Sequence, residues 1–262
     1  YDLPEFDLTD REHVLHVLGA VRPDVIVNCA AYTNVDQCES ESVLAHKVNG
    51  EGPGFLAEAA SISGAVLIHF STDYVFDGSK TTPYLEEDIP APKSEYGRSK
   101  LLGEIKIADS GLKDYYILRT SWLYGPGGKN FVDTIIRLAG EREELRIVAD
   151  QFGGPTFTHD LAEAVHQLLD STAGSGIYHF SNAGACSWYD FAVKIVDEAR
   201  KQNSELTLLR LLPIRTEEYP LPAPRPAYSV FSTEKYVNAT GAVVPDWQDA
   251  LVRYFAERKK VA

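Results

Sequence analysis

A tyrosine and a lysine stand four residues apart in the stretch YGRSK, as Tyr96 and Lys100. If this stretch is helical, the two side chains share one face, with Cβ atoms about 5–6 Å apart. A lysine ammonium beside a phenol favours the phenolate and lowers the tyrosine pKa from its ordinary value of about 10. Such a tyrosine can give or take a proton near neutral pH. Tyr-x-x-x-Lys also occurs by chance on many helices, so the pair alone leaves a purely structural role open.

A second polar group lies where a buried strand is expected to end. The run AVLIHFST (65–72) is apolar until its last residues, and Asp73 and Tyr74 follow Thr72 directly. The carboxyl ends of parallel strands are where α/β enzymes bind ligands and carry out chemistry. Thr72 therefore joins Tyr96 and Lys100 as a candidate catalytic residue.

The elements that must position these residues alternate between strands and helices. Apolar, β-branched runs predict strands at 24–30, 65–72 and 115–121. Helical patterns cover 41–61, with a kink expected at the GPG of 52–54, and 96–109. This alternation predicts an α/β fold, a Rossmann-like doubly wound parallel sheet. The run 24–30 is apolar enough to be covered on both faces.

The pattern changes after about residue 122. Amphipathic helices are expected at 131–140, 159–170, 187–199 and 247–259, short strands at 176–182 and 206–212, and an extended proline-rich loop at 220–229. We expect a dinucleotide-binding domain over residues 1–125. Residues 126–262 would form mainly a smaller, mixed α/β substrate-binding domain, with some segments returning to the first domain and the site between the two.

Composition excludes several classes of function. The net charge of −13 argues against a nucleic-acid surface, which needs a basic stripe. The longest apolar runs are of strand length, so we expect no transmembrane helix. The three cysteines have no metal-ligand spacing and predict reduced thiols in a cytoplasmic protein without a bound metal. His69, His159 and His179 also lack ligand spacing and are expected to be structural.

Five motifs together resemble one known family. They are NCAAYTNVDQCE (28–39), STDYVFDG (71–78), YGRSK (96–100), RTSWLYG (119–125) and GPTFTHDLA (154–162). In this order and spacing the chain resembles the dTDP-4-dehydrorhamnose reductases of the extended short-chain dehydrogenase/reductase superfamily. The resemblance implies reduction of the C4 keto group of dTDP-4-dehydro-L-rhamnose to dTDP-L-rhamnose, with NADPH or NADH as cofactor. As partners we expect this nucleotide sugar and at most a second copy of the chain.

The resemblance also implies catalytic and substrate-binding roles. Tyr96 would protonate the sugar O4, Lys100 would lower the Tyr96 pKa and bind the nicotinamide ribose, and Thr72 would orient the keto oxygen. The sugar and its diphosphate would be contacted by Asp73, Tyr74, Val75, Trp122 and Arg225. Trp122 could instead belong to the core, and Arg225 could be an ordinary surface residue.

The cofactor would be bordered, on the same resemblance, by Asp7, Leu8, Ala30, Ala31 and Thr33. Asp7 could instead cap the helix that begins near residue 9 or 10. The two alanines could be small only for close packing. Asn49 faces the cofactor in many relatives, but it could equally bond a neighbouring strand.

The chain departs from the family pattern in two places. The family opens with a strand and a Gly-rich turn that holds the cofactor pyrophosphate, and we expect roughly thirty residues of this kind to precede Tyr1 in such a fold. Tyr228 stands where many relatives have Asn.

Other functions remain on the same fold. Related dehydratases follow the threonine with an Asp-Glu pair, and epimerases carry a run of small residues there. A non-catalytic subunit, resembling the regulatory β subunit of methionine adenosyltransferase, is the alternative from another class. The retained Thr72, Tyr96, Lys100 and Trp122 favour an enzyme.

Overall fold

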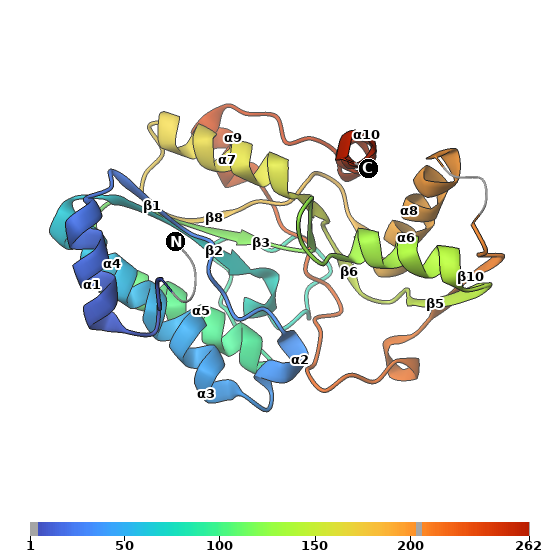
Figure 1. The fold of residues 1–262 in the computed structure, drawn as a ribbon, viewed down its shortest axis with the longest axis horizontal. Coiled ribbons are helices and arrows are strands. Elements are labelled where there is room, and N and C mark those ends of the chain that lie inside the picture. The colour runs from blue at the N-terminus through green and yellow to red at the C-terminus, as the bar shows by residue number, and fades with distance from the viewer. Residues whose placement is uncertain (1–4, 203–205, 262) are drawn as a thin grey trace.

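The computed structural model describes residues 5–202 and 206–261 of the 262-residue chain (Figure 1). The helices are α1 (Arg11–Val21), α2 (Val35–Cys38), α3 (Ser42–Ala45), α4 (Gly52–Ser63), α5 (Glu95–Asp109), α6 (Phe131–Glu141), α7 (Thr158–Asp170), α8 (Trp188–Gln202), α9 (Glu234–Thr240) and α10 (Trp247–Val261). A π-helical segment, η1 (His46–Glu51), joins α3 to α4, and 3-10 turns lie at η2 (Asp73–Val75) and η3 (Thr216–Glu218). The strands are β1 (Val25–Asn28), β2 (Val66–Thr72), β3 (Tyr115–Thr120), β4 (Leu123–Tyr124), β5 (Glu144–Val148), β6 (Phe152–Gly153), β7 (Thr156–Phe157), β8 (Gly176–His179), β9 (Cys186–Ser187) and β10 (Arg210–Ile214).

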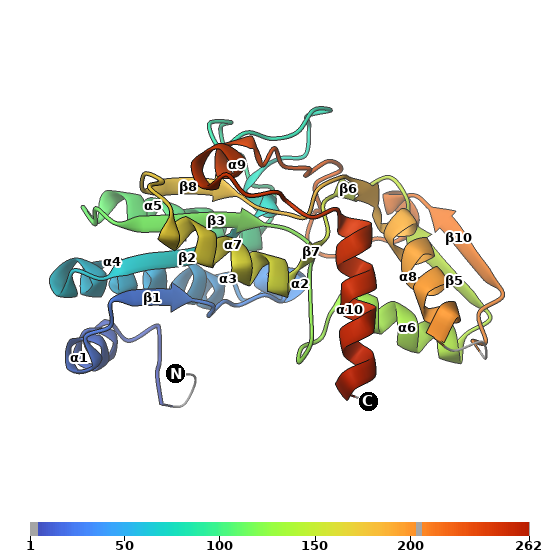
Figure 2. The same ribbon diagram turned by 90° about the horizontal axis from the view of Figure 1, so that it is seen from above.

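The main sheet is parallel and has the order β1-β2-β3-β8. Helices α1, α4 and α5 cover one face, and α7 and α9 cover the other (Figures 1 and 2). Successive strand residues serve opposite faces: Leu67 and Ile117 pack with α1, α4 and α5, whereas Ile68 and Leu118 pack with α7 and α9. The Rossmann-like α/β fold expected from the sequence is therefore confirmed.

Most element predictions are confirmed, but three differ from the structure. The helical region 41–61 does not simply kink at the prolines, because π-helical η1 interrupts it and Pro53 lies in the first turn of α4. The strand expected at 206–212 begins later, at Arg210. The sequence predicts that β1 is covered on both faces, but Val27 is 46% exposed, so the described residues cover the face that carries Val27 only in part.

The C-terminal unit has its own core. Strands β5 and β10 form a parallel pair, and α6, α8 and α10 pack around them with a cluster of aliphatic and aromatic side chains (Figure 2). Strand β8 and helices α7 and α9 come from the same half of the sequence but build on the main sheet. The C-terminal half of the chain thus contributes to both units.

One segment leads from β10 back to the main sheet. Phe231 pairs with Tyr84, Tyr228 pairs with Phe152, and Ala223 donates a backbone hydrogen bond to Asp36. The proline-rich loop expected at 220–229 belongs to this segment.

Of the helices in the described ranges, none combines the length and apolar character needed to cross a membrane.

Candidate active site

The proposed catalytic side chains gather at the carboxyl edge of β2. Thr72 is the last residue of β2, and its hydroxyl accepts a hydrogen bond from the Tyr74 amide. Ser94 caps α5 by accepting from the Gly97 amide, which places Tyr96 in the first turn of the helix. A Cβ atom on Gly97 would stand 2.2 Å from the Tyr74 carbonyl oxygen. Glycine at this position therefore lets the first turn of α5 approach η2 closely.

Tyr96 lies beside Thr72 and Tyr74, two residues predicted from the sequence to belong to the same site. Its hydroxyl lies near Thr72, and its ring makes an edge contact with the Tyr74 ring at 5.5 Å between centroids. Burial raises the pKa of Tyr96 above its ordinary value, and the nearby Thr72 hydroxyl opposes this rise. The lowered Tyr96 pKa expected from Lys100 is not found in this arrangement, because the lysine amine is bonded elsewhere.

Lys100 is 2% exposed and points to β2. Its Nζ donates to the Phe70 carbonyl at 2.5 Å and lies 3.3 Å from His69 Nε2. Burial lowers the pKa of Lys100 to about 8, although the nearby Glu104 carboxylate favours the charged form. His69, expected to be merely structural, is thus a direct neighbour of the proposed catalytic lysine.

Asp73 is a buried carboxylate that is only partly hydrogen-bonded. Its Oδ1 accepts from the Thr72 hydroxyl at 3.1 Å. Its Oδ2 is buried and has no hydrogen-bond partner among the described residues. Burial raises the pKa of Asp73 to about 6, although the nearby Ser229 and Thr72 hydroxyls favour the charged form. A buried, unpartnered acceptor beside Thr72 suits a hydroxyl group of a ligand.

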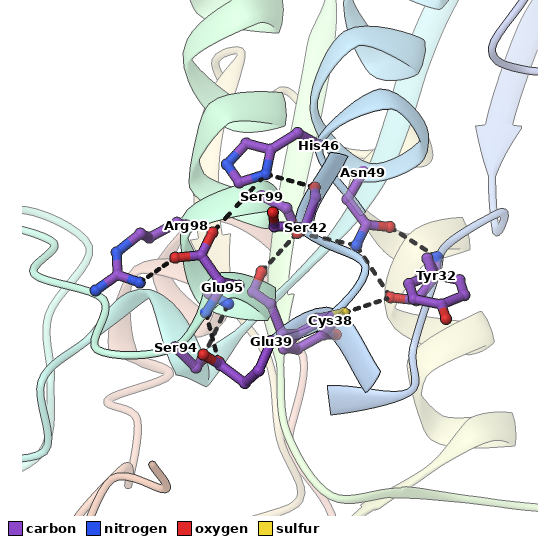
Figure 3. Close-up of polar contacts among 12 residues, drawn as sticks. Tyr32, Cys38, Glu39, Ser42, His46, Asn49, Ser94, Glu95, Arg98 and Ser99 are labelled. Atoms are coloured by element: carbon purple, nitrogen blue, oxygen red, sulfur yellow. Dashed lines mark hydrogen bonds and ion pairs between the residues drawn. The ribbon is translucent and has the colours of Figure 1, made fainter. Parts of the chain in front are cut away.

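Asn49 joins the segment after β1 to α5. Its amide nitrogen donates to the Tyr32 carbonyl and to Ser99 Oγ, both at 3.0 Å, and its Oδ1 accepts from the Tyr32 amide at 2.8 Å (Figure 3). Ser99 in turn donates to the carbonyl of Tyr96. Nearby, Glu39 accepts from the Glu95 amide at 2.8 Å. Asn49 is fully buried, so it bonds neighbouring backbone and holds the loop against the helix that carries Tyr96.

The residues expected to border the cofactor divide into two groups. Ala30 and Thr33 are exposed and Ala31 is half-buried directly after β1, at the edge where sheets of this kind bind dinucleotides. Short side chains that stay accessible at this edge are compatible with a nicotinamide cofactor. Leu8 is 6% exposed and packs in the core against α4. The side chain of Leu8 is therefore unavailable to a ligand in this arrangement.

Asp7 forms a local turn. Its Oδ1 accepts from both the amide and the hydroxyl of Thr9 at 2.8 Å, and these bonds lower the pKa of Asp7. The helix cap of α1 is Asp10, which accepts from the His13 amide. The alternative that Asp7 caps this helix is therefore wrong.

Two residues expected in the sugar pocket pack into cores. Val75 is fully buried in a small cluster that also contains Phe76, Tyr84 and Phe231. Trp122 stacks on Trp188 at 3.5 Å between ring centroids and packs, partly buried, against the core of the C-terminal unit. The core alternative for Trp122 thus describes its main contacts.

Arg225 makes a two-pronged ion pair. Its two terminal nitrogens bond Asp36 at 2.6 and 2.7 Å, and one of them also donates to the Ala223 carbonyl. The Tyr74 side chain lies near the guanidinium, which is therefore beside the proposed pocket. Contact with a diphosphate, as expected from the sequence, would require Arg225 to exchange Asp36 for the phosphate oxygens.

Asn28 and Glu104 have no role predicted from the sequence, and His69 is expected there to be only structural. Glu104 stands four residues after Lys100, so its place on the same helical face was readable from the spacing. The three cysteines are unpaired, with Cys29 exposed and Cys38 and Cys186 buried. Within the described ranges, no group of three His, Cys, Asp or Glu side chains is arranged to hold a metal ion.

Comparison with known proteins gives consistent matches over nearly the whole chain. The family model described as "RmlD substrate binding domain" matches residues 1–260. The dTDP-4-dehydrorhamnose reductase of Burkholderia thailandensis is 45% identical over 257 residues, which are 94% of this chain and 86% of the relative. The spore coat polysaccharide biosynthesis protein SpsK of Bacillus subtilis is 46% identical over 252 residues, 96% of this chain and 86% of the relative. A crystal structure of the Bacillus anthracis dTDP-4-dehydrorhamnose reductase in complex with NADP superposes with a TM-score of 0.91 at 42% identity, covering 98% of this chain and 89% of the other.

Proposed function

Because the chain belongs to the dTDP-4-dehydrorhamnose reductase family, we propose that it reduces the C4 keto group of dTDP-4-dehydro-L-rhamnose to give dTDP-L-rhamnose. The reaction consumes one NADPH or NADH and one proton per ketone. The observation that carries the mechanism is the placement of Tyr96 next to Thr72 at the carboxyl edge of β2, where Tyr74 contacts both residues. The relatives reported above include no regulatory subunit, so that alternative has no support from them.

In the proposed mechanism each residue has one task. When bound, NADPH or NADH would supply the hydride that C4 of the sugar receives. Tyr96 gives its phenolic proton to O4, where negative charge develops as the ketone is reduced. Thr72 turns its hydroxyl from Asp73 to the keto oxygen and fixes its direction.

The remaining contacts of the mechanism concern binding. Asp73 uses its free Oδ2 to accept a hydroxyl hydrogen of the sugar. Ala30, Ala31 and Thr33 would border the cofactor. Tyr74 lines the sugar pocket through its contact with Tyr96. A homodimeric state and a cytoplasmic location stay predictions from the sequence.

The first test is a coupled assay that follows the loss of NADPH or NADH absorbance in the presence of dTDP-4-dehydro-L-rhamnose. We expect Tyr96→Phe to lower kcat about 10²–10⁴-fold, because it removes the proton donor, with KM nearly unchanged. Tyr116→Phe is the matched control, since its hydroxyl bonds the Ala173 carbonyl at the opposite end of the sheet and its loss should leave kcat unchanged. Near-full activity of Tyr96→Phe would reject Tyr96 as the acid. No substrate-dependent consumption by the wild type with either cofactor would reject the reductase function itself.

A further inference from the structure

Three buried polar side chains form a row beneath the candidate active site. Asn28 on β1 and His69 on β2 are partners in the parallel register, and Lys100 reaches them from α5. Their exposed fractions are 5%, 1% and 2%. Polar groups buried this deeply must satisfy their hydrogen bonds within the protein, so the direction of each bond is constrained.

The direction of the first bond follows from the Asn28 amide. Its Oδ1 accepts from the Ala30 backbone amide at 3.1 Å, so its Nδ2 is the atom 3.0 Å from His69 Nδ1. An amide nitrogen can only donate, which means that His69 Nδ1 accepts. Burial and the Lys100 charge lower the pKa of His69 well below its ordinary range, so the ring is neutral. The single ring proton therefore sits on Nε2.

The second bond runs from this Nε2–H toward Lys100. His69 Nε2 is 3.3 Å from Lys100 Nζ, which also donates to the Phe70 carbonyl at 2.5 Å. An ammonium has no lone pair, so the contact with Nε2–H is a hydrogen bond only when Lys100 is a neutral amine. An ammonium in the same place would meet the Nε2–H as one donor against another.

The other titratable groups around Lys100 are few. Tyr96 and Glu104 lie one turn before and after it on α5, and the Glu104 carboxylate favours the ammonium. Arg119 from β3 pairs with Glu104 at 2.7 Å and offsets part of that effect. From β1 and β2, the groups that face Lys100 or its neighbour are Asn28 and His69. Asn28 and His69 on the strands thus favour the neutral amine of Lys100, whereas Glu104 on the helix favours the ammonium.

We propose that Asn28 and His69 are positioning residues that fix the Lys100 amine and bias it toward the neutral form, so that Lys100 changes its protonation state in the pH range where the enzyme works. Asn28 acts at one remove, by selecting the His69 tautomer that donates to Lys100. A lysine that exchanges its proton in this range can follow the protonation changes of Tyr96 during turnover. The inference rests on the proposed reductase function for its catalytic meaning, but the protonation of Lys100 can be measured without substrate.

Asn28→Asp is the sharpest variant, because it keeps the shape of the side chain and reverses the first bond. The second carboxylate oxygen accepts where the amide donated, so the His69 proton moves to Nδ1. Nε2 then offers a lone pair to the Lys100 ammonium. We expect the Lys100 midpoint, followed by NMR of protein with isotope-labelled lysine and assigned with Lys100→Arg, to rise by about one pH unit or more.

His69→Phe separates the tautomer effect from the added charge of Asn28→Asp. It keeps a buried ring, adds no charge and removes the Nε2–H, so the Lys100 midpoint should also rise, by less. It also carries the test if Asn28→Asp does not fold, as judged by circular dichroism. An unchanged midpoint in folded His69→Phe would overturn the proposal, because a charge effect alone would then explain any shift in Asn28→Asp.

The pH profile of kcat gives the catalytic readout. In Asn28→Asp, the limb that reports Lys100 should move in the same direction as the NMR midpoint, whereas a merely structural defect would lower kcat equally at every pH. If the wild type shows no reductase activity, the proposed function fails while the NMR titration still decides the tautomer argument. If the wild type is active and the kcat profile of the folded variant keeps its midpoint, the inference fails and the function stands.

Discussion

Near the carboxyl edge of the main sheet the buried side chains are mostly polar, whereas under α8 and α10 they are aliphatic or aromatic. The polar region, as we name it, contains Asn28, His69, Ser71, Thr72, Asp73, Lys100, Glu104, Arg119 and His179. The apolar region is the core of the C-terminal unit, in which Phe191, Ile195 and Leu251 are fully buried. The two regions lie in one chain and are buried to a similar degree, so the contrast is one of chemistry.

The two buried regions contribute differently to the stability of the protein. Burying a large apolar side chain contributes about 1.5–3 kcal/mol, so the apolar region stabilises its unit directly. A buried ion pair gives little net stability, because desolvation cancels much of the attraction. The Glu104 carboxylate, paired with Arg119, also accepts a hydrogen bond from the hydroxyl of Ser71, which precedes Thr72. The polar region therefore holds the ends of β2 and α5 in position more than it stabilises the fold.

The largest effect should come from breaking that ion pair on one side only. Glu104→Gln leaves the Arg119 guanidinium, 1% exposed, without a counter-charge, and should lower the free energy of unfolding by about 3–5 kcal/mol. Equilibrium unfolding in urea measures this loss.

The double variant Glu104→Leu with Arg119→Met sharpens the comparison. It replaces both charges by apolar groups of similar size, so it should recover most of the stability that Glu104→Gln loses. Activity should not recover with it, because Ser71 loses its partner beside Thr72. A double variant as unstable as the single one would mean that the pair itself stabilises the fold, and the contrast between the two regions would disappear.

The sequence was sufficient for the fold because the relevant signals are local. Apolar runs and turn residues marked β1, β2 and β3, and helical periodicity marked α6, α7, α8 and α10 close to their observed bounds. The π-helical segment η1 was missed because its residues, HKVNGE, have no distinctive pattern. The start of β10 was misplaced because the apolar run from 206 to 212 begins before the residues that pair with β5.

The site was only partly predictable. The positions of Thr72, Tyr96 and Lys100 follow from the strand end and the helical spacing. The directions of side chains do not: Leu8, Val75 and Trp122 turn into cores, and Lys100 turns to His69, because tertiary packing selects the rotamer. Arg225 and Asp36 are far apart in the sequence, and only the return of the proline-rich loop brings them together.

A second, pH-dependent effect should appear in the polar region. Asp73 has a folded pKa of about 6 against an ordinary 3.8. The native state therefore binds the proton more tightly, and its contribution to stability is full well below about pH 4 and lost as the pH rises through about 6. The loss amounts to about 3 kcal/mol, since one pKa unit corresponds to about 1.4 kcal/mol.

Asp73→Asn cannot ionise and so should escape this loss. We expect the free energy of unfolding of the variant, relative to the wild type, to increase by about 2.4 kcal/mol between pH 4 and pH 7.5, measured in urea at both values, since part of the loss already occurs below pH 4. A constant cost from the new amide would shift both values equally and would not alter the difference. Parallel stability curves for the two proteins would show that Asp73 titrates normally.

The smallest predicted effect comes from a substitution in the apolar region, which serves as the comparison for the substitutions in the polar region. Ile195 is fully buried in α8, and Ile195→Val removes one methylene from its core. The free energy of unfolding should fall by about 0.5–1.5 kcal/mol. Because none of the side chains in this core cluster carries a charge at neutral pH, the loss should be the same at pH 4 and at pH 7.5. Reductase kcat and its pH profile should not change, since the side chain packs in a separate core from Tyr96. A loss that varied with pH, or that altered the profile, would show that the two regions are coupled and that the apolar core also helps to set the protonation of the site.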